Sequence, residues 1–459
     1  MSDNNTNNFQ KNLTQRHILF IALGSAIGTG LFYGAADAIR LAGPSVLFAY
    51  FISGLIAFII MRALGEMALH NPISGSFARY ANQYISPLAG FITGWSFIME
   101  LILVCLADIT AFTTYMRFWY PEVEPWLFAL SITLIICAMN LINVKIYGEF
   151  EFFLSLIKVL AIIAMILGGI AIIFFGFGTI DHHAIGLQNL WKNGGWFPHG
   201  WEGFFASFAL TLFAFGGIET IGLAITETKD PQKNIAKAIN TIPIRIILFY
   251  VLTIAVLIII YPWNKIGVDG SPFVKMFSSL GIHSAANILN IIVISAAISA
   301  INSDIYGASR MLHGLSEEGQ AFKKLNKLTK NGIPLPAVFL IFIILILGVI
   351  LNYFFQEKLF LYIAVLSTFC QLIVWIMILL AQFFMRLKMT KEEQKKLSYP
   401  VPFWPFFPIL SFLFIIFICF FLGKVTSLKA LILAGAIWFA VLIIAFYSLK
   451  NVKKNHKNF

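Results

Sequence analysis

Residues 17–38 read HILFIALGSAIGTGLFYGAADA, an apolar run in which three of the seven residues at 24–30 are glycine, at positions 24, 28 and 30. About 20 apolar residues are enough for a helix to cross the roughly 30 Å of hydrocarbon in a bilayer. Each glycine inside a helix costs about 1 kcal/mol relative to alanine. The run therefore predicts a membrane-spanning helix that breaks near its middle.

The composition of the whole chain is that of an integral membrane protein. Of its 459 residues, 59% are hydrophobic and 12% are charged, against roughly 45–50% and 25% in soluble chains. No soluble core of this size would hold so many apolar side chains. We therefore predict an all-α integral membrane protein with twelve transmembrane helices, at about 17–38, 44–66, 87–117, 126–144, 152–176, 203–225, 241–262, 285–312, 336–354, 358–386, 404–423 and 427–449.

The net charge of +11 reflects where the basic residues lie along this path. If the twelve spans alternate in direction, most of the 32 lysine and arginine residues fall on one face of the membrane, including the cluster at 323–330. By the positive-inside rule this face is cytoplasmic. We therefore expect cytoplasmic tails at residues 1–16 and 450–459, and no nucleic-acid partner.

Cysteine and histidine residues give no sign of a metal site or a disulfide framework. Cys105, Cys137, Cys370 and Cys419 lie singly in apolar runs, and the eight histidines show no ligand spacing. The sequence also lacks a recognisable motif that pairs a nucleophile with a base or two catalytic carboxylates. We expect no metal, no cofactor and no enzymatic activity.

A second interrupted run, FAFGGIE, occupies residues 213–219 in the middle of the sixth predicted span. Five spans precede the sixth, so a second group of five would cross the membrane in the opposite sense to the first. Inverted repeats with a broken helix at corresponding positions are typical of secondary transporters. We expect a first inverted repeat at 17–176, a second at 203–386, and two further spans at 404–449.

Broken helices expose backbone groups that lipid cannot satisfy. The N–H groups near Thr29 and Gly30 suit a carboxylate, whereas carbonyl groups near Ala26 and from Phe213 to Gly216 suit an ammonium. The two breaks together predict a site for a zwitterion such as an amino acid.

Each glycine motif also has a simpler explanation. Gly24 and Gly28 form a G-x-x-x-G pattern, and the second motif would give another close helix contact. The occurrence of both breaks at the same ordinal position in two inverted halves favours a substrate site. We expect Phe213 and Phe215, beside the second break, to act as substrate gates.

Five charged residues lie well inside predicted spans: Glu100, Asp108, Glu219, Asp304 and Lys158. Such a side chain costs roughly 2.5–3.5 kcal/mol on insertion scales and is a functional candidate by default. Glu219 directly follows the second break, and Glu219 or Glu100 is expected to bind and release a proton during transport. The alternative for each carboxyl group is a neutral, hydrogen-bonded acid that fixes helix packing.

The fifth span carries its single cation, Lys158, about two turns from the cytoplasmic side. Its ammonium is expected to occupy the place of a coupling Na⁺, donating to carbonyls near Ala22 and to Ser299 or Ser303. That arrangement would favour protons over sodium. The alternative is that the side chain snorkels to the interface.

These motifs resemble those of bacterial amino-acid permeases of the amino acid–polyamine–organocation superfamily, in its amino-acid transporter family, over residues 13–449. The shared motifs are GSAIGTGLF (24–32), RALGEMA (62–68), PISGSFARYA (72–81), GWSF (94–97), LIKV (156–159), FAFGGIE (213–219), ETKDP (227–231) and NIAKAIN (234–240). Three further stretches, at 142–159, 261–274 and 298–322, resemble the proline-specific permeases.

The resemblance implies a LeuT-like, five-plus-five inverted repeat with two added C-terminal helices, in the bacterial cytoplasmic membrane. It places substrate contacts at Ala26, Ile27, Gly28, Thr29, Gly30, Phe213, Ala214, Phe215, Gly216, Gly217 and Glu219. It also matches Lys158 to the family's lysine in the fifth span, and Glu100 to the proline-type subgroup.

We therefore expect a proton-coupled importer of a neutral amino acid, with proline favoured, that works by alternating access. The alternatives within the class are a permease for another neutral or aromatic amino acid, or for γ-aminobutyrate. From other classes, a channel and a non-transporting amino-acid sensor stay open. The expected partners are the amino acid, protons and the lipid bilayer, and the sequence does not indicate an oligomeric state.

Overall fold

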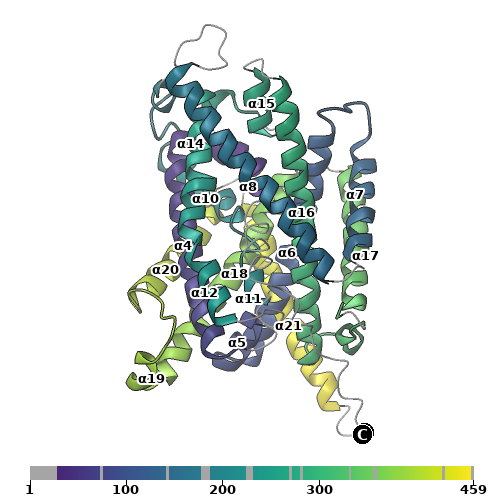
Figure 1. The fold of residues 1–459 in the computed structure, drawn as a ribbon. Helices are drawn as coiled ribbons and strands as arrows, with labels where there is room; N and C mark the ends of the chain where they lie inside the picture. The colour runs from purple at the N-terminus through teal and green to yellow at the C-terminus, as the bar shows by residue number, and fades with distance from the viewer. Residues whose placement is uncertain are drawn as a thin grey trace.

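The computed structural model is a bundle of long helices, most of which run along a common axis (Figure 1). It describes residues 28–72, 76–140, 144–176, 187–223, 231–267, 271–279, 283–329, 332–354, 359–425 and 429–455. Within these ranges all regular secondary structure is helical and no strand occurs. The predicted all-α class is confirmed for this part of the chain.

The helices have the following bounds: α2 (Thr29–Phe32), α3 (Gly34–Ala42), α4 (Val46–His70), α5 (Ser76–Tyr84), α6 (Pro87–Met116), α7 (Pro125–Asn140), α8 (Val144–Phe175), α9 (Gly200–Ala206), α10 (Phe208–Phe213), α11 (Thr220–Leu223), α12 (Pro231–Asn240), α13 (Ile242–Arg245), the π-helix η4 (Ile246–Leu252), α14 (Thr253–Ile260), α15 (Pro272–Ser279), α16 (His283–Glu317), α17 (Leu335–Phe354), α18 (Leu359–Lys388), α19 (Lys391–Lys395), α20 (Phe406–Lys424) and α21 (Lys429–Asn455). Short 3₁₀ turns complete the path at Gly43–Ser45, Gln188–Leu190, Trp263–Lys265 and Lys323–Asn326.

Eight stretches of the described chain are long and apolar enough to cross a membrane, fewer than the twelve predicted spans. The physical reasons are local. The first two predicted spans follow each other through a tight turn at Gly43 and count as one stretch, Gly34–His70. The helices α7 and α17 are apolar but shorter, and the sixth predicted span is divided into α9, α10 and α11.

The outer surface of the bundle is apolar along whole helices. On α8, Phe153, Leu160, Leu167 and Phe174 recur every seventh residue and are each about 60% exposed. Residues at this spacing lie on one side of a helix. A single exposed stripe of large apolar side chains is suited to contact with lipid, so α8 faces the membrane along its length.

The centre of the bundle is α6, which packs most extensively against α16 and α18. It begins at Pro87, and the Ser86 hydroxyl caps it by accepting the Ala89 N–H at 3.2 Å. Nearly every side chain along its membrane-spanning part is buried. Polar groups on α6 are therefore sealed inside the protein.

The predicted break in the sixth span is confirmed. Helix α10 ends at Phe213, residues 214–219 form successive turns, and α11 begins at Thr220. Gly217 has φ +81°, a left-handed backbone conformation that residues other than glycine rarely adopt. The six residues between the two helices are buried or nearly so.

The first predicted break lies only partly within the described residues. Gly28 is extended and helix α2 begins at Thr29, so the expected half-helix start near Thr29 and Gly30 is confirmed. Residues 24–27, which include the predicted contacts Ala26 and Ile27, lie outside the described residues.

A buried ion pair joins α4 to α18. Arg386 donates to the Glu66 carboxylate from Nε at 2.7 Å and from Nη2 at 2.5 Å. Gln382 Nε2 and the Val401 N–H donate to the same carboxylate at 2.9 Å and 2.5 Å. Because both carboxylate oxygens are satisfied, this pair has the complete hydrogen bonding that burial of charge demands.

Candidate functional site

The two broken segments meet in the interior of the bundle. A Cβ atom built on Gly30 would lie only 2.7 Å from the Cα atom of Ala214. A contact this short is possible only for glycine, so the start of α2 passes the break after α10 backbone against backbone. The structure thus brings the start of the first broken segment, at Gly30, together with Ala214 of the second.

The N-terminal end of α2 is tied to α6. The Thr29 hydroxyl donates to the Asp108 carboxyl group, and both residues are almost completely buried. Asp108 therefore anchors the first broken segment, which agrees with the packing alternative for this residue.

Neighbouring side chains satisfy backbone groups around the second break. The Tyr250 hydroxyl, from the π-helix η4, donates to the Ala214 carbonyl at 2.9 Å. From α18, Gln371 Nε2 donates to the Leu212 carbonyl at 3.2 Å. Such bonds stabilise a non-helical segment at membrane depth, where lipid offers no partner.

Carboxyl groups from α6 and α16 approach the glycine pair of the break. Glu100 Oε1 lies 3.3 Å from the position of a Cβ on Gly216, and Asp304 Oδ1 lies 3.6 Å from that on Gly217. Glu100 is fully buried, and neither of its carboxyl oxygens has a hydrogen-bond partner within the described residues. Because the two glycines have no side chains, there is space for these carboxyl groups to approach the backbone of the break.

Glu219 ends the broken segment and points toward α18. Its side chain is fully buried, and its Oε1 accepts a hydrogen bond from the Trp375 indole N–H. Its Oε2 has no partner among the residues that the structure describes.

Lys158 is buried completely, which argues against the snorkelling alternative. Its Nζ donates to Ser299 Oγ on α16 at 2.8 Å, one of the expected contacts. The other expected partner, the carbonyl of Ala22, lies outside the described residues. The lysine therefore links α8 to α16 in the interior.

The two predicted gating aromatics are packed against other rings. Phe213 meets Phe360 edge to face, with centroids 5.8 Å apart, and Phe215 lies 4.4 Å from the Tyr250 ring. Both phenylalanines are nearly fully buried. Each therefore covers one side of the break in this structure.

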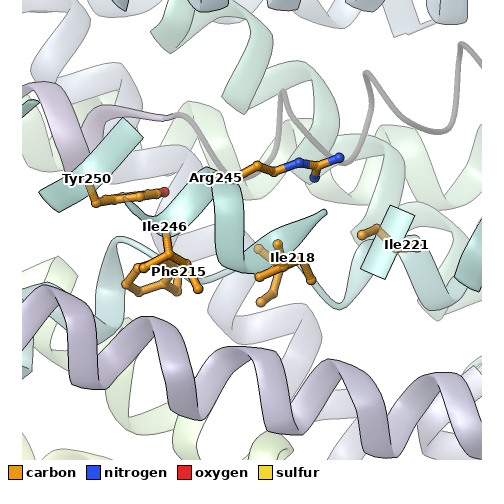
Figure 2. Close-up of a pocket in the computed structure, with 7 residues that line it drawn as sticks. Phe215, Ile218, Ile221, Arg245, Ile246 and Tyr250 are labelled. Atoms are coloured by element: carbon orange, nitrogen blue, oxygen red, sulfur yellow. The ribbon is translucent and has the colours of Figure 1, made fainter. Parts of the chain in front are cut away.

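A small cavity of about 20 Å³ lies between the break and the helix segments α13 and η4. Figure 2 shows Phe215 and Ile218 of the broken segment opposite Ile246 and Tyr250, with Arg245 at the edge. The cavity has the volume of about one water molecule. It is too small for an amino acid, although Phe215, one of the predicted substrate contacts, lines it.

The sequence analysis missed the polar side chains of α18 and η4 that contact the break. Thr368, Gln371 and Trp375 lie in an otherwise apolar span, and their spacing of three and four residues puts them on one helix face. That periodicity was the available signal. Tyr250 gave no such signal, because a single tyrosine in a span is common.

Long apolar helices around a broken helix, with acidic groups and a lysine sealed inside, define a multi-pass membrane transport protein. The chain belongs to the amino acid permease family, whose sequence model matches residues 17–458. It is therefore an amino-acid transporter and not an enzyme.

Relatives in bacteria match nearly end to end. The uncharacterized amino acid permease YtnA of Bacillus subtilis is 45% identical over 97% of this chain and 96% of its own length. The probable threonine/serine transporter YbxG of Bacillus subtilis is 41% identical over 98% and 97%. The aromatic amino acid transport protein AroP of Salmonella typhimurium is 42% identical over 86% of each chain.

Proposed function

We propose that this permease imports a neutral amino acid, with proline as the first candidate, together with protons. The observation that carries the proposal is the break at 214–219, where bare backbone meets buried carboxyl groups. Substrate binding is assigned to residues 26–30 and 213–217 with Glu100, and proton coupling to Glu219 and Lys158.

The chemistry of the break supports a zwitterionic substrate. The start of α2 presents backbone N–H groups near Thr29 and Gly30, which suit a carboxylate. Glu100 brings a buried carboxyl group to within 3.3 Å of the Cβ position of Gly216, and a carboxylate suits an ammonium. An amino acid is a small solute that carries both charges.

Proton coupling is supported by the charges around the break. Among the described residues, one oxygen of Glu219 and both oxygens of Glu100 have no side-chain or backbone donor at hydrogen-bonding geometry, so each acid is a candidate to exchange a proton. Lys158 donates to Ser299 and places a fixed positive charge inside the bundle. A fixed ammonium there would repel a sodium ion and already supply the positive charge that the ion would bring.

The remaining parts of the proposal concern topology. We assign residues 17–176 and 203–386 to two inverted repeats of a LeuT-like fold, followed by two further spans. Both termini are placed in the cytoplasm of a bacterial cell, because lysine and arginine concentrate on that face of the predicted path.

Proline is favoured over the other candidates by the motifs at 142–159, 261–274 and 298–322. A protonated proline has two N–H donors, one fewer than a primary amine, and needs fewer acceptors around its nitrogen. Threonine, serine, an aromatic amino acid or γ-aminobutyrate are the alternatives, and two of these classes appear in the names of the relatives.

The test is uptake into proteoliposomes that contain the purified full-length chain. We expect labelled proline to accumulate above its external concentration when the pH is lower outside, and external alkalinisation to accompany uptake. Saturable uptake of another amino acid that proline does not compete against would replace proline. Equilibration without accumulation would indicate a channel, and binding without flux would indicate a sensor.

A further inference from the structure

One face of α18 lies against α10 and against the end of the break that follows it. Thr368, Gln371 and Trp375 succeed each other by three and four residues, so their side chains lie in one row. All three are buried to within 1% exposure. A row of polar groups this deep in a membrane protein needs partners on a neighbouring element.

Each residue of the row bonds to a successive point on the broken span. The hydroxyl of Thr368 lies 2.7 Å from the Ala209 carbonyl in α10 and 2.9 Å from the Ala364 carbonyl of its own helix, and shares its one hydrogen between them. Gln371 Nε2 donates to the Leu212 carbonyl at 3.2 Å. The Trp375 indole N–H donates to Glu219, directly before α11. Thus α18 contacts the span before the break and again at its end.

The contact of Gln371 also orients its other amide atom. An amide oxygen cannot donate to a backbone carbonyl, so Nε2 is the atom that faces Leu212 and Oε1 faces away from it. Oε1 lies 3.5 Å from the position of a Cβ on Gly216, on which Glu100 Oε1 also converges. The amide oxygen of Gln371 therefore points toward Gly216 in the break.

The contact of Trp375 distinguishes the two oxygens of Glu219. An indole N–H is a donor only, so the oxygen that receives it stays an acceptor whether the carboxyl group is charged or neutral. Oε1 is the bonded oxygen, and Oε2 has no partner within the described ranges. In a neutral carboxyl group the carbonyl oxygen is the better acceptor, so the persistence of the indole bond to Oε1 favours protonation at Oε2.

We propose that α18 is the positioning element of the broken helix, and that Trp375 is a positioning residue that holds Oε1 of Glu219 and leaves Oε2 to take up and release the proton. This inference rests on the proposed coupling role of Glu219. The step is a reversible proton transfer, with no other bond made or broken.

The first experiment reads the indole directly and requires no transport. Protein labelled with ¹⁵N at the tryptophan indole is studied by NMR, and the Trp375 signal is identified by its loss in Trp375→Phe or by its response to Glu219→Gln. We expect this signal to move with pH, because its acceptor changes from carboxylate to neutral acid, and to lose this movement in Glu219→Gln.

Trp119 is the matched control, because its indole donates at 2.7 Å to an uncharged amide oxygen, that of Asn287. Its signal should not respond to Glu219→Gln. A Trp375 signal that ignores pH, or that still titrates in Glu219→Gln, would overturn the assignment. Failure of amino-acid uptake would leave this measurement unaffected, so the two proposals fail separately.

The second experiment is a double-mutant cycle on proton-driven accumulation. Trp375→Phe keeps a ring and removes the N–H, and we expect a roughly tenfold loss, in the range for one hydrogen bond to a charged group. In a Glu219→Gln background the same substitution should cost nothing further, since the two residues act as one unit. Losses that multiply in the double variant would mean that Trp375 only fills space. Trp119→Phe serves as the control.

Discussion

Single residues at the break show how glycine and acid are combined. Gly216 and Gly217 have no side chains. The carboxyl groups of Glu100 and Asp304, on two other helices, lie close to the space that side chains there would fill. The sequence identified these acids by their unusual depth in apolar runs. It could not show that α6 and α16 carry them to the same two glycines, because that depends on how helices pack.

Substitution of Glu219 by glutamine tests coupling at this scale. The amide keeps the size of the side chain but cannot take up a proton near neutral pH. We expect proton-driven accumulation to fall strongly while exchange of substrate across the membrane is retained. Initial rates over a range of pH give the measurement, and exposed Glu202→Gln is the control. An unchanged pH profile would remove Glu219 from coupling.

Removal of the Lys158 ammonium is predicted to slow the transport cycle. Lys158→Ala deletes the 2.8 Å bond to Ser299 and leaves a buried hydroxyl without its donor. We expect normal amounts of protein in the membrane but a reduced uptake rate. Lys429→Ala, on an exposed side chain, should have no effect. Transport at the normal rate in Lys158→Ala would reduce the lysine to a packing role.

At the scale of elements, the break in the sixth span was predictable and its support was not. Glycine and a following glutamate at 216–219 are local signals, and the structure places the turns there. The hydrogen bonds from α18 and η4 join residues more than 30 positions apart. A single sequence contains no local trace of such pairings, beyond the polar spacing within α18.

Glycine substitutions should separate the break from ordinary helix positions. Gly217→Ala forces a side chain onto a backbone with φ +81°, and Gly30→Ala drives a methyl group against Ala214. We expect both to abolish uptake. Gly168→Ala, in α8, meets nothing within 4 Å and should leave uptake intact. Full activity in Gly30→Ala would show that the two segments need not touch.

The ion pair between α4 and α18 is predicted to dominate stability at its end of the bundle. Glu66→Gln leaves the Arg386 guanidinium buried without its counter-charge, at a cost of roughly 3–5 kcal/mol. We expect a clear drop in the melting temperature of the detergent-purified protein. Glu392→Gln breaks an exposed pair with Lys395 and should change little. Equal effects of both would contradict the burial.

At the scale of the whole molecule, composition alone fixed the class, while the number of spans depended on local detail. Tight turns, short helices and a broken helix reduce the twelve apolar runs to eight stretches of the described chain that are long and apolar enough to cross a membrane. Hydropathy reports how apolar a segment is, and does not report where its hydrogen-bond ladder stops. The inverted repeat therefore stays a prediction.

Membrane orientation is predicted from the distribution of lysine and arginine. A fluorescent protein fused after residue 459 should be fluorescent, because we expect this end in the cytoplasm. Alkaline phosphatase fused after Lys424, in the loop between α20 and α21, should be active, because that loop is expected on the opposite face. The reverse pattern would invert the whole topology.

The bare passage of Gly30 over Ala214 has an evolutionary consequence. Main-chain atoms are common to every sequence, so the proposed binding of a zwitterion's charged ends by main-chain atoms would survive most mutations. Residues that determine substrate selectivity could then diverge without affecting this main-chain binding. Relatives whose names give different cargoes at about 40% identity accord with this separation. Redesign of selectivity should therefore leave both glycine motifs untouched.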